Sequence, residues 1–140
     1  MALAWTTDEL YAQLQNLPLA ENARISFLDS VDPAIEVVLS EFGDLPVQVT
    51  VTGEQILVSA PLWEVNAIID VHRFNHLALK LNPVNPLSNI GLIDLPGGRE
   101  LYVMFGELPI SSDLKHIVEE IDLVAENTIA AAELFASQLK

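Results

Sequence analysis

The sequence of 140 residues contains no cysteine and only six lysine and arginine residues. A chain without cysteine forms no disulfide, no thiolate metal site and no cysteine nucleophile. Against the six basic residues stand twenty aspartate and glutamate residues, so the formal net charge at pH 7 is −14. Such an acidic surface repels phosphate backbones and anionic lipid heads. It argues against direct binding of nucleic acid and favours a partner protein with a basic face.

Long apolar runs are missing as well. No stretch approaches roughly 18 residues without a charge or a proline, so no membrane-spanning segment is expected. The N-terminal residues Met1–Trp5 include no basic residue and are soon followed by Asp8 and Glu9, which is unlike a secretory signal peptide. These observations predict a cytoplasmic protein.

Apolar residues nevertheless make up 51% of the chain, which is enough to form a hydrophobic core. The sequence has no internal repeat, no low-complexity tract and no linker-like composition. Residues 1–140 are therefore expected to fold as one domain.

The first half of the chain predicts one helix followed by strands. Thr6 and Glu9 have the spacing of a capping box, so a helix should begin after Thr6 and end at Pro18. Three later segments of β-branched, aromatic or alternating residues predict a meander of three strands, and a fourth segment joins its edge if it is also extended. The meander is expected at 35–42, 47–51 and 55–60, ending at Pro61, with 24–28 at the edge.

The second half predicts a helix, a hairpin and a long helix. Residues 71–81 follow a helical period with Asp70 as a cap, and Pro83 and Pro86 then break the chain. A hairpin is expected from 89 to 105, turning at Pro96-Gly97-Gly98. The order helix, three strands, helix, two strands, long helix predicts an α+β fold with a single antiparallel sheet, and the last helix lies across one face.

The last helix is the longest periodic segment, with Ser111 or Ser112 as its expected cap. If it runs from there to Ser137, it is about 40 Å long. Its apolar positions recur at steps of three and four and are Leu114, Ile117, Ile121, Val124, Thr128, Ala131 and Phe135. The small side chains at 130–132 leave two possibilities open, which are close packing on the chain's own sheet and contact with another copy or a partner helix.

Two histidines have the spacing of a helical zinc site. His72 and His76 stand at i and i+4, but no third ligand accompanies them and Arg73 lies between them. The pattern favours two partly exposed histidines without a metal. An enzyme or a small-molecule binder built around this pair is the alternative.

No other pattern predicts catalysis. The carboxylates of Glu119, Glu120 and Asp122 point around the last helix and are interpreted as a solvated face. No serine lies in a nucleophile-elbow context. We therefore predict no catalytic, cofactor-binding or metal-binding residue.

Several segments together resemble the YjfI family of uncharacterised bacterial proteins. The segments are Gly53–Val58, Phe74-Asn75, Pro86-Leu87-Ser88, Tyr102–Leu108, Ser111-Ser112, Ile117, Glu119-Glu120-Ile121, Leu123, Asn127 and Ala131-Ala132-Glu133. The resemblance implies no established activity. It implies a genomic neighbour that is a coiled-coil protein of envelope stress, similar to phage shock protein A. The order of elements is also similar to that of type III secretion chaperones, which are small, acidic and dimeric and bind extended segments of their partners; this similarity is an analogy of topology and charge.

These observations favour a non-enzymatic, acidic protein-interaction or chaperone-like protein that acts in the stress response on a basic or amphipathic partner. The face that binds the partner is predicted to be apolar at its centre and acidic around it. Its expected residues are Glu119, Glu120, Glu126, Ala131 and Phe135. A structural homodimer subunit is a further alternative.

Overall fold

The computed structural model describes residues 4–140. The helices are α1 (Thr7–Gln15), α2 (Val71–Leu81) and α3 (Leu114–Leu134). The strands are β1 (Ala23–Leu28), β2 (Ala34–Leu39), β3 (Leu45–Val51), β4 (Gln55–Glu64), β5 (Asn89–Leu95) and β6 (Arg99–Pro109). Short 3-10 helices join some of these elements, among them η1 (Pro18–Glu21) and η2 (Ser40–Phe42). None of the described helices is both long enough and apolar enough to cross a membrane.

All six strands form one antiparallel sheet with the order β1-β2-β3-β4-β6-β5. The two predicted strand regions meet where β4 pairs with β6, from Gln55 opposite Pro109 to Glu64 opposite Leu101. This confirms the α+β fold with a single antiparallel sheet. The segment expected at the sheet edge, residues 24–28, forms β1. Four strands therefore precede α2, where the sequence predicted three and left the fourth open.

β4 is longer than predicted. Pro61 does not end it, because the strand continues to Glu64 through an irregularity in its pairing with β6. A proline is tolerated where the ladder is interrupted, since no hydrogen bond from its missing amide is then required. The prediction that Pro61 ends the meander was therefore wrong.

The caps of the first two helices agree with the sequence. The Thr6 hydroxyl accepts a hydrogen bond from the Glu9 amide at 3.2 Å. The Asp70 carboxylate accepts one from the Arg73 amide at 3.1 Å. Each side chain satisfies an amide that has no partner in the first helical turn.

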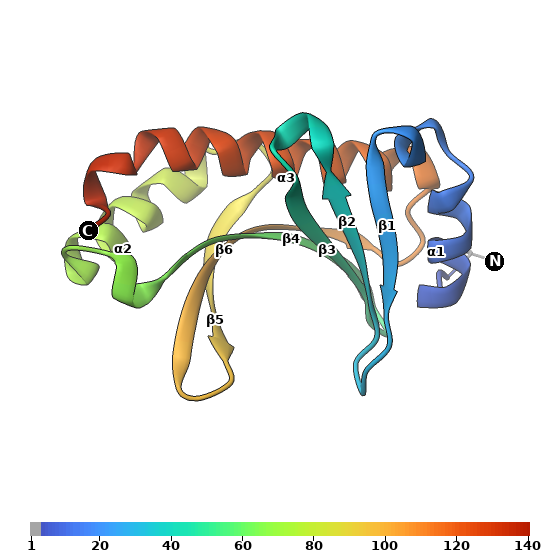
Figure 1. Cartoon of the computed structure of the whole chain (residues 1–140), viewed down its shortest axis with the longest axis horizontal. Helices are drawn as coiled ribbons and strands as arrows, with labels where there is room; N and C mark the ends of the chain where they lie inside the picture. Colours follow the sequence, from blue (N-terminus) through green and yellow to red (C-terminus); the bar gives the residue numbers. More distant parts are fainter. Residues whose placement is uncertain (1–3) are drawn as a thin grey trace.

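α3 lies across one face of the sheet and spans most of the molecule (Figure 1). Its cap is Asp113, not Ser111 or Ser112, because the Ser112 amide is still part of a turn and donates to the Pro109 carbonyl at 2.9 Å. The 21 residues of α3 have a length of about 32 Å at 1.5 Å per residue, shorter than the sequence suggested.

The core lies between the sheet and the helices. Of the predicted α3 stripe, Leu114 is half-buried and the other members are buried. The Phe135 ring lies 4.9 Å from the Phe74 ring of α2, and Ala131 is 3% exposed. Ala131 therefore packs against the chain itself, whereas Ala130 is exposed and Ala132 is half-buried, so contact of this part of α3 with another copy or a partner helix stays a prediction.

The opposite face of the sheet is concave, and no described helix covers it. Figure 1 shows α2 and α3 on one side of the sheet, with α1 beside β1, while the β1–β2 and β5–β6 hairpins project to the other side. The two hairpins flank the middle of β4, so the uncovered face is bounded at both ends.

Candidate partner-binding face

The outer side of the first half of α3 forms two adjoining hollows with η1 and η2. The first has a volume of about 390 Å³ and the second about 260 Å³, and Pro18, Leu19 and Val118 line both. The other apolar side chains of this surface are Leu17, Leu39, Phe42 and Leu114. The acidic side chains that line it are Glu41, Glu119 and Asp122. We refer to this surface as the α3–η1 face.

Local sequence explains the apolar part of this face. Pro18 has no amide for a helix hydrogen bond, so α1 ends before it and the chain turns into η1. This turn brings Leu17 and Leu19 against α3. On α3 itself, Leu114 and Val118 stand at i and i+4 beside the buried stripe, so both are only half-buried.

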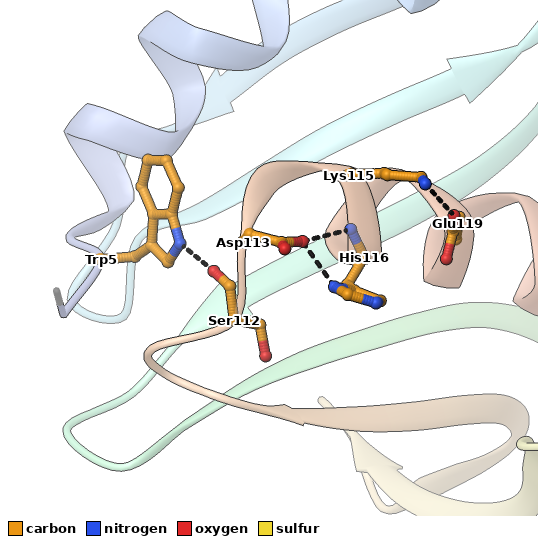
Figure 2. Close-up of polar contacts among 6 residues, drawn as sticks. All are labelled: Trp5, Ser112, Asp113, Lys115, His116 and Glu119. Atoms are coloured by element: carbon orange, nitrogen blue, oxygen red, sulfur yellow. Dashed lines mark hydrogen bonds and ion pairs between the residues drawn. The ribbon is translucent and has the colours of Figure 1, made fainter. Parts of the chain in front are cut away.

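The start of α3 is held by polar contacts (Figure 2). The indole Nε1 of Trp5 donates to the Ser112 carbonyl at 2.7 Å. Asp113 Oδ1 accepts from the His116 amide at 2.9 Å and lies 2.5 Å from His116 Nδ1. The pKa of Asp113 is below its ordinary value. The main cause is the hydrogen bond from this amide, and the interactions with the imidazole lower the pKa further. The Asp113 cap fixes where α3 begins, and the bond to Trp5 holds this end of the helix, which carries Leu114 and Val118, against the N-terminal segment.

Carboxylates from two elements meet at the second hollow. Partial desolvation raises the pKa of Asp122, and the nearby carboxylates of Glu126 and Glu41 raise it further. Glu126 lies one turn along α3 from Asp122, whereas Glu41 belongs to η2. A cation placed here would relieve the repulsion among the three groups.

The first hollow, of about 390 Å³, is lined by one basic side chain, that of Lys115. Lys115 Nζ lies 4.0 Å from Glu119 Oε1, with the two side chains 82% and 59% exposed. An exposed pair at this distance contributes little to stability, so either group is available to a partner.

The structure separates the predicted partner-binding residues into two groups. Glu119 and Glu126 are exposed on the outer side of α3. Glu120, Ala131 and Phe135 are 8%, 3% and 4% exposed and face the interior, so the prediction that they form a binding surface was wrong. The reason is helical phase, because each of the three lies three or four residues from other buried positions of α3.

The burial of Glu120 also corrects its interpretation as part of a solvated face. Its Oε1 atom has no hydrogen-bond partner among the described residues, and burial raises the pKa of the carboxyl group. The space for it comes from Gly106 of β6, because a Cβ atom at that position would lie 1.8 Å from Glu120 Oε1. The spacing on α3 carried a signal for this burial that the interpretation missed, since Glu120 follows Ile117 by three residues.

A second buried polar residue connects α3 to the loop before β5. Asn127 Nδ2 donates to the Pro86 carbonyl at 2.8 Å and to Ser88 Oγ at 2.9 Å. Asn127, Pro86-Leu87-Ser88 and Gly106 all belong to the segments that carried the family resemblance. The family resemblance therefore included these residues. In the structure they pack α3 against the sheet and the loop before β5, and they do not form an exposed site.

The two histidines lie on the exposed side of α2. Within residues 4–140, no group of three or more histidine, cysteine, aspartate or glutamate side chains is arranged to hold a metal ion. His72 and His76 would therefore supply two ligands at most.

The chain belongs to a bacterial protein family, DUF2170, described as an uncharacterized protein conserved in bacteria; the family model matches residues 4–139. It is 26% identical over 132 residues to the protein YjfI of Escherichia coli strain K12, with 94% of this chain and 96% of YjfI covered. The identity to YjfI of Escherichia coli O157:H7 is also 26% over 132 residues. The resemblance seen in the sequence is thus confirmed.

Two solved structures are similar to this chain, and the first of them shares its fold. YbjN of E. coli superimposes with a TM-score of 0.64 and 18% identity, over 99% of this chain and 98% of that chain. The ExsC–ExsE complex gives a TM-score of 0.45 and 16% identity, over 99% of this chain and 97% of that chain. The similarity to YbjN extends over the whole sheet and its helices, so it concerns the fold.

Proposed function

We propose that this protein binds another protein, in the manner of a chaperone, by holding a basic amphipathic segment of its partner on the α3–η1 face. The observation that carries the proposal is the combination of adjoining apolar hollows with carboxylates from α3 and η2 beside them. Apolar side chains at the centre of an interface provide the affinity, and charges around it guide the encounter and select the partner.

The face determines what the bound segment should look like. Leu19 and Val118 stand between the two hollows, so the segment should present apolar side chains on both sides of this ridge. A lysine or arginine of the segment should face Asp122, whose neighbours Glu41 and Glu126 are also acidic. An amphipathic helix with a basic edge meets both requirements.

The first partner to test is a coiled-coil protein similar to phage shock protein A, which the family resemblance implies. Coiled-coil proteins consist of long amphipathic helices with charged edges, so they offer segments of the required kind. On this proposal the protein works in the cytoplasm, in the response to envelope stress, and needs no cofactor. The proposal does not require a homodimer.

The test is a measurement of association and dissociation rates with the purified coiled-coil partner at low and high ionic strength. Association should slow as salt screens the acidic side chains, while dissociation changes less. Glu119→Lys and Glu126→Lys should slow association. Val118→Asp should weaken binding about tenfold or more, mainly through faster dissociation, because it places a charge at the centre of the apolar surface.

The matched control is Glu133→Lys. Glu133 is exposed on the same helix and lies seven residues beyond Glu126, about 10 Å along the axis. This variant should leave both rates almost unchanged. Association that is independent of salt, or an equal effect of Glu133→Lys, would contradict the proposal.

A further inference from the structure

The uncovered face of the sheet carries an apolar surface of its own, away from α3. Along β4, Ile56, Val58 and Ala60 are buried under the helices, whereas Leu57 and Ser59 alternate with them and point to the opposite side. In a sheet with one face in solvent, that opposite side is normally polar. Here polar side chains alternate with large apolar ones, and Figure 1 shows that this face of the sheet is concave.

Two hollows occupy this face, with volumes of about 440 Å³ and 200 Å³. Gln48, Ser59, Ile93 and Val103 line both of them, so the two hollows form one continuous groove across the middle strands. Its other apolar side chains include Leu57, Leu101 and Phe105. We call this surface the concave groove.

The floor of the groove depends on a close contact between β5 and β6. Gly91 has no side chain, and a Cβ atom there would lie 2.8 Å from Cε1 of the Phe105 ring. One edge of the Phe105 ring therefore lies against Gly91, whose partner on β6 is Val103. Ile93, two residues along β5, is 45% exposed, so the apolar floor is open to solvent.

The charges of the groove are of one sign. Glu107 lines the larger hollow and Glu36 the smaller one, and no lysine or arginine lines either of them. A second copy of this chain would bring the same carboxylates and a further net charge of −14 to the interface. Repulsion between like charges therefore argues against self-association through the groove.

We propose that the concave groove is a second protein-binding surface, which takes an amphipathic helix with basic residues beside its apolar stripe. A concave face receives a convex partner, and a helix with its side chains is a cylinder about 10 Å across. An extended segment would add to a strand edge instead, because its hydrogen bonds lie in the plane of the sheet. The inference is independent of the α3–η1 face, since the two surfaces share no residue.

The probe is a fluorescently labelled synthetic helix with leucine on one side and lysine on the others, titrated with the protein in an anisotropy experiment. The same helix with glutamate in place of lysine is the control for charge. We expect the lysine helix to bind and the glutamate helix to bind at least about tenfold more weakly. Equal binding of the two helices would overturn the assignment of a basic partner.

Variants locate the binding site of the lysine helix. Ile93→Asp and Glu107→Lys should each weaken binding about tenfold, whereas Leu79→Asp should have no effect. Leu79 is the matched control because it is an apolar side chain on α2 that is 69% exposed. Glu107 is also exposed, so Glu107→Lys keeps the test decisive if Ile93→Asp does not fold.

Two further results separate this surface from its alternatives. Because the α3–η1 face is itself proposed to bind a basic amphipathic helix, the lysine helix is also titrated with Val118→Asp. Binding that persists in this variant and is lost when Glu107→Lys is added belongs to the groove, whereas loss of all binding in Val118→Asp alone would overturn the proposal while supporting the other face. Sedimentation should show the same mass for the unmodified chain and Ile93→Asp. A change from dimer to monomer would mean that a second copy occupies the groove, and would also overturn the proposal.

Discussion

The two sides of α3 carry the same chemical group in opposite surroundings. Glu119 and Glu120 are neighbours in the sequence, yet the Glu119 side chain is 59% exposed and Glu120 is 8% exposed. Glu119 lies beside a lysine, whereas Glu120 lies against Gly106 without a hydrogen-bond partner among the described residues. A carboxylate on the outer side can therefore serve recognition, while one on the inner side affects packing and stability. The following four predictions test this comparison, beginning with the largest expected effect.

The largest loss of stability is expected from a substitution at Gly106 of β6, which lies against the inner side of α3. Gly106→Ala places a methyl group 1.8 Å from Glu120 Oε1, so the carboxyl group must move within a packed interior. We expect the free energy of unfolding in urea to fall by about 2–3 kcal/mol. Gly53→Ala is the control, because nothing lies within 4 Å of its added Cβ.

A double-mutant cycle with Glu120→Ala sharpens this prediction. Removing the carboxyl group should relieve most of the effect of Gly106→Ala, so the two changes should be strongly non-additive. Additive effects would show that the glycine is needed for another reason.

The next largest effect is expected at Asn127. Asn127→Ala removes two hydrogen bonds and leaves the Pro86 carbonyl without this donor. The free energy of unfolding should fall by about 2 kcal/mol. The neighbouring Glu126→Ala, on the exposed side, should change it by less than about 0.5 kcal/mol. Similar losses in the two variants would contradict the division of α3 into two sides.

The third prediction concerns charge at Glu120. Burial raises the pKa of this carboxyl group above its ordinary value of 4.5, so the folded chain holds the proton more tightly than the unfolded chain. Its contribution to stability is then full below pH 4.5 and is lost as the pH rises through the folded-state pKa. Glu120→Gln should therefore be more stable than the unmodified chain by about 1 kcal/mol at neutral pH.

Urea titrations as a function of pH measure this difference. The gain from Glu120→Gln should disappear below pH 4.5, where both side chains are neutral. A loss of stability at neutral pH would mean that the ionised carboxylate has a cationic partner.

The smallest effect on stability is expected at Glu119. Glu119→Gln breaks only the exposed contact with Lys115 at 4.0 Å. The free energy of unfolding should change by less than about 0.5 kcal/mol, and thermal denaturation measures this. A change as large as that of Glu120→Gln would remove the distinction between the two glutamates.

The local elements were predictable from the sequence because their signals lie within a few residues of one another. The Thr6 cap, the Asp70 cap and the extent of α2 at 71–81 all agree with the structure. The strand at 89–95 does as well. Each depends on the backbone hydrogen bonds of one turn or on the conformational limits of a proline, and these act without the rest of the fold.

Other features were decided by the assembled structure. β4 passes Pro61 because β6, far along the chain, supplies the pairing on one side. The hollows of the α3–η1 face need Leu19 and Val118 side by side, although 99 positions separate them in the sequence. No pattern within one segment of the sequence predicts that two such distant residues line the same hollow.

The sequence by itself determined the elements of this protein, the α+β order in which they occur and its acidity. Only the tertiary structure decided which carboxylates face solvent, because a helix of 21 residues has one side against the sheet and the rotation of that helix is set by its contacts. The bond between Trp5 and Ser112 holds α3 at one end, and the bonds of Asn127 to Pro86 and Ser88 hold it near the middle. Glu119 therefore contacts a neighbour on its own helix, Lys115, whereas the surroundings of Glu120 come from Gly106, in a different element.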